Sequence, residues 1–159
     1  EGFMCTDYYV PVITLLAQSS RSEQILEMLK YFLGLGLDIN AKDHWGCSFL
    51  HWLLMEQKYK CKVENGELTL DWKEPKSDNA ANIEDELFDF LLSNENLDIY
   101  ESDPEDPLNY AIFTCKDKWI QALLQRRNTP LNWRHIHYAC YEGRLNVVKM
   151  LLRIGNVQF

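Results

Sequence analysis

The chain has 159 residues, which is enough for one domain with a sizeable hydrophobic core. Its composition, 47% hydrophobic and 25% charged, is ordinary for a water-soluble protein. The formal net charge of −8 argues against binding to a phosphate backbone, because nonspecific nucleic-acid affinity depends on clustered lysine and arginine. No stretch approaches the roughly 20 apolar residues that a membrane-spanning helix needs, so we expect no membrane segment.

Five cysteines at irregular spacing, without a CxxC pair, favour reduced thiols over a disulfide framework. We therefore expect an intracellular protein, either cytoplasmic or nuclear. The chain opens on Glu1 and carries repeat-like sequence near both ends, so we expect it to be a segment of a longer protein.

An apolar pattern that ends in leucine-type pairs occurs four times along the chain. The clearest copies span 28–36 and 147–155, and weaker copies span 87–92 and 119–124. Apolar residues at steps of three and four predict helices that each bury one stripe. Because a unit of this size cannot bury its stripe alone, the recurrence predicts a stacked array of repeats.

The spacing between the copies locates an insertion. The last leucines of the first two copies, Leu33 and Leu92, are 59 residues apart. Leu92 and Leu124 are 32 residues apart, and Leu124 and Leu152 are 28 apart. For a repeat period of about 33 residues, the first interval holds an insertion of about 26 residues.

Turn sequences with glycine or proline precede the expected inner helices. The best one spans 38–51, and weaker ones lie at 10–13, 106–111 and 134–140. Proline suits the first turn of a helix, where the first amide donors have no partner in the helix, so Pro107 can begin one. These turns, with the leucine copies, resemble the ankyrin repeat and its Thr-Pro-Leu-His signature across nearly the whole chain.

The resemblance implies an all-α ankyrin-repeat solenoid of about four helix-turn-helix units, with a β-hairpin insertion in the second unit. In the family, the residue before the proline caps the inner helix and bonds the histidine ring. This register pairs Ser48 with His51, and it pairs His137 with Arg134, which cannot cap. It treats the chain as one domain over 1–159, with repeats at about 7–39, 40–98 (insertion 57–82), 99–128 and 129–159.

The insertion carries a hairpin signal. Apolar and polar residues alternate on both sides of an Asn-Gly pair, which is the strongest short-range indication of a hairpin. Residues 73–82 are expected to form a flexible loop, with the next helix beginning near Ile83. An isolated hairpin is marginally stable, so it either packs on the repeats or orders on a partner. Its candidate binding residues are Asn65, Gly66, Leu68, Leu70 and Trp72.

In ankyrin arrays the turn tips and exposed inner-helix positions line one concave surface. Tryptophan and tyrosine are over-represented at binding hot spots, and carboxylates there would orient a lysine or arginine of a partner. The alternative for the tryptophans is that they fill gaps left by lost consensus residues. The positions that the resemblance assigns to this surface are His44, Trp45, Met55, Glu56, Glu105, Phe113, Trp133, Tyr141 and Glu142.

The sequence carries no recognisable catalytic motif. The two histidines of His135-Ile136-His137 do not amount to a zinc site, which usually needs four ligands at recognisable spacing. We expect no cofactor and no catalysis. The resemblance implies a protein-protein interaction module that binds a basic or apolar segment of another protein, or another domain of the same protein. Two alternatives are a rigid spacer or intramolecular dock in a larger multidomain protein, and nucleotide or oligonucleotide sensing by aromatic stacking, which would need a basic groove.

Overall fold

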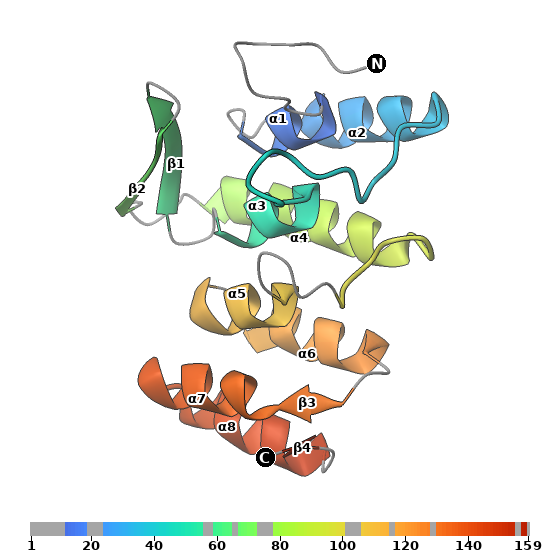
Figure 1. Cartoon of the computed structure of the whole chain (residues 1–159). Coiled ribbons are helices and arrows are strands. Elements are labelled where there is room, and N and C mark those ends of the chain that lie inside the picture. The colour runs from blue at the N-terminus through green and yellow to red at the C-terminus, as the bar shows by residue number, and fades with distance from the viewer. Residues whose placement is uncertain are drawn as a thin grey trace. The chain divides into compact units, whose positions relative to one another are not determined.

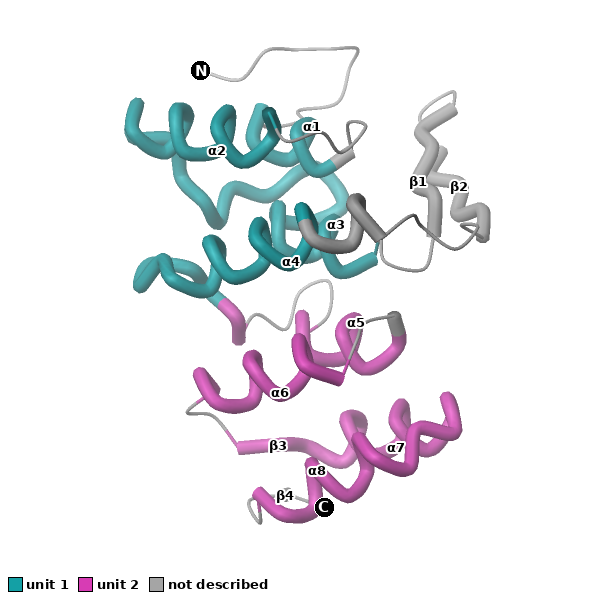
Figure 2. Tube along the Cα trace, turned by 180° about the vertical axis from the view of Figure 1, so that it is seen from behind, with its two compact units in different colours: residues 1–98 teal, residues 99–159 magenta. Residues whose placement is uncertain are grey.

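The computed structural model of the chain describes residues 12–18, 24–55, 59–64, 67–72, 78–100, 106–114, 117–127, 130–154 and 157–158. It divides into two compact units, residues 1–98 and 99–159 (Figure 2). The division coincides with the boundary that the sequence places between the second and third repeats. The described residues are mainly helical, which confirms the all-α fold class.

Unit 1 contains two helix pairs and one strand pair (Figure 1). Helix α1 packs against α2 and against α3. The elements of unit 1 are α1 (Val12–Gln18), α2 (Gln24–Gly34), α3 (Phe49–Met55), β1 (Tyr59–Glu64), β2 (Glu67–Trp72) and α4 (Asp78–Ser93).

Unit 2 contains two helix pairs in two layers. Helix α5 packs on α7 in the inner layer, α6 packs on α8 in the outer layer, and each inner helix also contacts its outer partner. The short strands β3 and β4 pair in parallel. The elements of unit 2 are α5 (Pro107–Thr114), α6 (Asp117–Arg126), β3 (Leu131–Asn132), α7 (Trp133–Tyr141), α8 (Leu145–Ile154) and β4 (Val157–Gln158).

The apolar steps of three and four residues explain which helix faces are buried. Helix α2 buries Ile25 and Leu29, and α8 buries Val147 and Leu151, each pair four residues apart. Residues at this spacing lie on one helix face, so each outer helix buries a single stripe. The sequence prediction for these helices is confirmed.

Helix α3 differs, because every residue from Phe49 to Met55 is buried. A helix that is apolar all round is an interior element. Met55 is 7% exposed, so its expected place on an exposed surface is wrong. The unbroken apolar run along this helix, with His51 as its one polar residue, was a local sign of this burial.

The insertion contains two antiparallel strands, β1 and β2, with Val63 opposite Leu68 and Glu64 opposite Glu67. The Asn-Gly pair between them lies outside the described residues, as do the strand side chains. Whether this pair of strands binds a partner stays a prediction. Helix α4 begins at Asp78, so the loop expected over 73–82 and the helix start expected near Ile83 are wrong at this end. Aspartate and asparagine are common in loops and are also strong helix N-caps, so Asp78 and Asn79 fit a helix start as well as a loop.

A buried aspartate organises the turn before α3. Asp43 Oδ1 accepts hydrogen bonds from the N–H groups of Trp45 (3.0 Å) and Cys47 (2.9 Å). Its Oδ2 accepts the indole N–H of Trp52 at 2.7 Å, and Gly46 supplies a positive φ of 78° within the turn. Glycine adopts this conformation without steric cost. Trp52 is therefore a core residue whose only polar atom is satisfied by the turn.

The Asp43→Ala substitution should destabilise the chain by about 3 kcal/mol, because it leaves buried N–H donors without acceptors. Urea unfolding followed by tryptophan fluorescence measures this difference. The matched control is His44→Ala at the exposed neighbouring position, which should cost less than about 1 kcal/mol. Equal losses for the two variants would contradict this role of Asp43.

Candidate functional site

The junction between the two helix pairs of unit 2 is built around Asp106, which immediately precedes α5. Its Oδ1 accepts the Leu108 N–H at 2.9 Å. The two carboxylate oxygens also face the Arg127 guanidinium, with Nη1 3.0 Å from Oδ1 and Nη2 2.7 Å from Oδ2. The Nε2 of His135 lies 3.1 Å from Oδ2. One buried carboxylate thus connects the start of α5, the end of α6 and the start of α7.

His135 also closes a capping box at the start of α7. Its Nδ1 accepts the Asn132 N–H at 3.0 Å, and the Asn132 side chain accepts from the Arg134 N–H at 3.0 Å. The Asn132 carbonyl also lies 3.2 Å from Nδ1, but with Nδ1 assigned as the acceptor of the Asn132 N–H, the ring proton is assigned to Nε2, which faces Asp106. The register that gave His137 the capping role is wrong: His135 is buried, and His137 is exposed.

The correct register was readable from spacing. Asn132 precedes His135 by three residues, as Ser48 precedes His51, and the His51 Nδ1 lies 2.8 Å from the Ser48 Oγ. Asparagine and serine are both strong helix N-caps. The sequence analysis started from the wrong histidine of the pair.

The charges around Asp106 change its pKa. Burial raises the pKa of this carboxyl, but the hydrogen bonds from His135 and Arg127, with the charge of Arg127, outweigh burial. The pKa therefore lies below its ordinary value of 3.8. A carboxylate with a pKa lowered by folding stabilises the folded state above its unfolded pKa, and this contribution is lost as the pH falls towards the folded pKa.

Arg144 fixes the opposite ends of these helices. Its Nη1 donates to the Ile112 carbonyl at 2.6 Å, near the end of α5, and its Nη2 pairs with Asp117 in the first turn of α6. Arg144 itself follows the turn at Gly143, whose φ is 66°. Last-turn carbonyls of a helix lack partners within it, so a guanidinium satisfies them well. The start of α5 is thereby linked to the first turn of α7 through Asp106 and His135, and the end of α5 is linked through Arg144 to the turn that follows α7.

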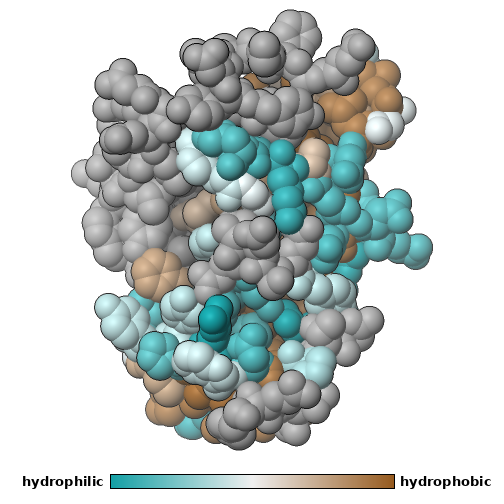
Figure 3. Space-filling view, viewed as in Figure 1, coloured by the Kyte–Doolittle hydropathy of each residue, from teal (hydrophilic) through white to brown (hydrophobic). Residues whose placement is uncertain are grey.

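The exposed face of α7 is lined by rings. Trp133, His137 and Tyr141 follow one another at four-residue steps, and we call them the ring stripe. Trp133 is 53% exposed and Tyr141 is 77% exposed. The rings of Trp133 and His137 meet edge to face at 5.9 Å, and the Arg134 guanidinium lies 5.8 Å from the Trp133 ring. In Figure 3, which is viewed as Figure 1, the lower part of the surface shows pale and teal residues beside brown, hydrophobic ones.

A shallow groove of about 220 Å³ adjoins the stripe between α5 and α7. Tyr138 is next in sequence to His137, and their rings are 6.1 Å apart. The stripe and the groove together form one surface on the inner layer of unit 2, and we call it the inner face. The groove is lined by Asn109, Tyr110, Phe113 and Tyr138.

The structure brings together only part of the predicted surface. Phe113 lies in the groove, and Glu142, half-buried, follows the stripe directly. Tyr110 and Tyr138 were missed, although each lies three residues from a residue that had been selected. Glu56, Glu105, Asn65 and Gly66, and the side chains of Leu68, Leu70 and Trp72, lie outside the described residues.

In unit 1, the predicted turn residues His44 and Trp45 lie against each other, with ring centroids 3.5 Å apart. Trp45 also meets the buried Trp52 edge to face at 5.8 Å. Trp45 is half-buried and His44 is exposed. Both readings of Trp45 therefore have a basis, because one part of the ring packs on the core and another part faces solvent.

Within the described ranges, no group of three or more His, Cys, Asp or Glu residues is arranged to hold a metal ion. None of the described helices is long and apolar enough to cross a membrane. A family model described as ankyrin repeats (3 copies) matches residues 78–158, about half of the chain. Neither a curated protein nor a solved structure matches the sequence.

The Asp106→Asn substitution should destabilise the chain by about 3 kcal/mol near neutral pH, because it leaves the buried Arg127 charge without its counter-charge. As the pH falls below the ordinary carboxyl pKa of 3.8 towards the lower pKa of the folded state, the difference from the unchanged protein should shrink, because the unfolded state takes up the proton first and the contribution of ionised Asp106 is lost. Urea unfolding at about pH 7 and about pH 3 measures both effects.

Asp117→Asn is the control for this experiment, because it removes an ion pair whose aspartate side chain is 46% exposed. It should cost less than about 1 kcal/mol at neutral pH. An Asp106→Asn loss no larger than this, or one that is unchanged in acid, would contradict the role given to Asp106.

Proposed function

Because this chain belongs to the ankyrin-repeat family, we propose that it binds a segment of another protein through the inner face of unit 2. Ankyrin repeats are generally protein-protein interaction modules and are typically non-catalytic. The observation that carries the proposal is the exposed ring stripe at Trp133, His137 and Tyr141 beside a groove. Tryptophan and tyrosine are over-represented at binding hot spots, and here both rings are exposed on one helix.

The chemistry of the inner face suits an apolar or basic segment. Indole and phenol rings attract cations over their faces, and this attraction strengthens when water is excluded. The Arg134 guanidinium, 5.8 Å from the Trp133 ring, is an example of this attraction within the chain. Glu142, immediately after the stripe, offers a carboxylate to a lysine or arginine. An apolar side chain of the segment would enter the groove beside Phe113.

The inner face is held in advance of binding. Asp106 and Arg144 fix the ends of α5 relative to α7, and His135 caps α7 on the side opposite its rings. A surface that is already ordered loses less conformational entropy on association. In unit 1, the exposed His44 and the half-buried Trp45 are a separate candidate contact for a partner.

We assign this binding to the cytoplasm or nucleus. The two cysteines that the structure describes, Cys47 and Cys140, carry free thiols, and Cys140 is exposed. Exposed thiols persist in reducing compartments. Capture from a cytoplasmic or nuclear lysate is therefore the appropriate assay.

The double substitution Trp133→Ala with Tyr141→Ala should weaken partner capture by about tenfold or more, because hot-spot rings contribute most of the affinity of an interface. Affinity capture from lysate, quantified by mass spectrometry against the unchanged chain, measures the loss. Helical circular dichroism should be unchanged, since both side chains lie outside the core.

The matched control is Leu145→Ala with Leu152→Ala on α8, where the side chains are comparably exposed at 61% and 53%. Capture should survive this change. A partner lost with the leucine pair and retained with the aromatic pair would refute the inner face as the binding site.

A further inference from the structure

The net charge of the whole chain conceals a division between the units. Residues 1–98 carry eight Lys and Arg against 18 Asp and Glu, a formal charge of −10. Residues 99–159 carry eight Lys and Arg against six Asp and Glu, a formal charge of +2. A negative total therefore says nothing against an anionic partner for unit 2.

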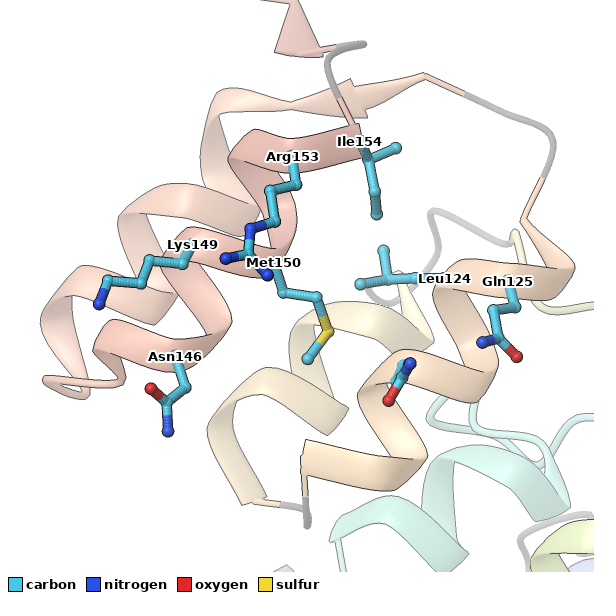
Figure 4. Close-up of a pocket in the computed structure, with 8 residues that line it drawn as sticks. Leu124, Gln125, Asn146, Lys149, Met150, Arg153 and Ile154 are labelled. Carbon is cyan, nitrogen blue, oxygen red and sulfur yellow. The ribbon is translucent and has the colours of Figure 1, made fainter.

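A groove of about 690 Å³ lies on the outer layer of unit 2, between α6 and α8, and we call it the outer groove. In Figure 4, Leu124, Met150 and Ile154 point into the space between the two helices. Leu124 is 8% exposed, whereas Ile154 is 46% exposed, so the apolar floor opens to solvent at one end. The other lining residues are Gln121, Gln125, Asn146, Lys149 and Arg153.

The charged residues of the outer groove are both cations. Lys149 and Arg153 are one turn apart on α8, and both are exposed. Neither makes an ion pair or a side-chain hydrogen bond with any residue that the structure describes. The lining contains no carboxylate, and the only one on α6 or α8, Asp117, is paired with Arg144. Among the described residues of α6 and α8, no carboxylate is therefore left to pair with these two cations.

We propose that the outer groove binds an acidic amphipathic helix of a partner protein. An apolar side chain of that helix would cover Leu124 and Met150, and its carboxylates would pair with Lys149 and Arg153. Helices α6 and α8 each have 10 residues and are about 15 Å long, which accommodates two to three turns of a docked helix. Docking of an apolar helix face into a groove between helices is an established recognition mode.

This site is separate from the inner face. The outer groove is formed by α6 and α8, whereas the ring stripe lies on α7 and its groove between α5 and α7. The two sites also differ in chemistry, because one is rich in rings and the other has an aliphatic floor with two cations. Failure of one proposal therefore leaves the other standing.

The direct test uses the methionine methyl groups as reporters. Of the three methionines that the structure describes, Met28, Met55 and Met150, only Met150 lines the outer groove. The chain, labelled with ¹³C at the methionine methyls, is titrated with a short peptide that has leucines at helical spacing and glutamates elsewhere. The Met150 methyl resonance, assigned with Met150→Leu, should shift progressively, while that of Met28 on α2 should stay in place.

Charge reversal at Lys149 and Arg153 (K149E with R153E) should lower the affinity for this peptide by about tenfold or more, because two attractive ion pairs with the peptide glutamates become repulsive. The control is reversal of a cation outside the groove, Arg134→Glu, which should change the affinity less than about twofold. Salt should weaken binding to the unchanged chain, since the pairs form at an exposed surface.

Three outcomes would overturn the proposal. The first is an unmoved Met150 methyl at millimolar peptide. The second is equal binding of a twin peptide with lysine in place of every glutamate. The third is a Met150 shift caused by vesicles of anionic phospholipid, or by self-association of the chain on concentration, and not by the peptide.

Discussion

A single buried carboxylate, Asp106, determines how the helices of unit 2 meet. Ionisation of this group in the interior is unfavourable alone, and it requires the guanidinium of Arg127 and the imidazole of His135. Each of these partners is at the start or end of a different element. The requirement to satisfy one charge therefore fixes three chain segments, and the positions of the ring stripe and of the outer groove follow from them.

Unit 1 meets the same requirement with different residues. Asp43 satisfies two turn amides and the indole of Trp52. The Ser48 N–H donates to the His51 Nδ1 before α3, as the Asn132 N–H donates to the His135 Nδ1 before α7. The common element is an acceptor placed to receive the backbone donors at a helix start. Turn sequences can diverge widely while this requirement is kept, which explains why the repeats differ so much in sequence.

The outer helices and the start of α5 at Pro107 could be predicted, because apolar spacing and proline geometry are local properties. The capping role of His135 was missed because two histidines in one turn compete for it, although the three-residue spacing from Asn132 was a local sign that favoured His135. The position of the outer groove depends on packing between elements. The candidate site was found in part, through Trp133, Tyr141 and Phe113.

The central claim is that His135 links the α7 cap to Asp106, with Nδ1 as the acceptor and the proton on Nε2. Long-range ¹H–¹⁵N correlation spectra of the four imidazole rings test this most directly, with His135 assigned by substitution. The account predicts a protonated Nε2 that is protected from exchange with solvent, and an unprotonated Nδ1 that accepts the Asn132 N–H. A ring protonated at Nδ1 alone, or an Nε2 proton that exchanges as fast as that of exposed His137, would contradict it.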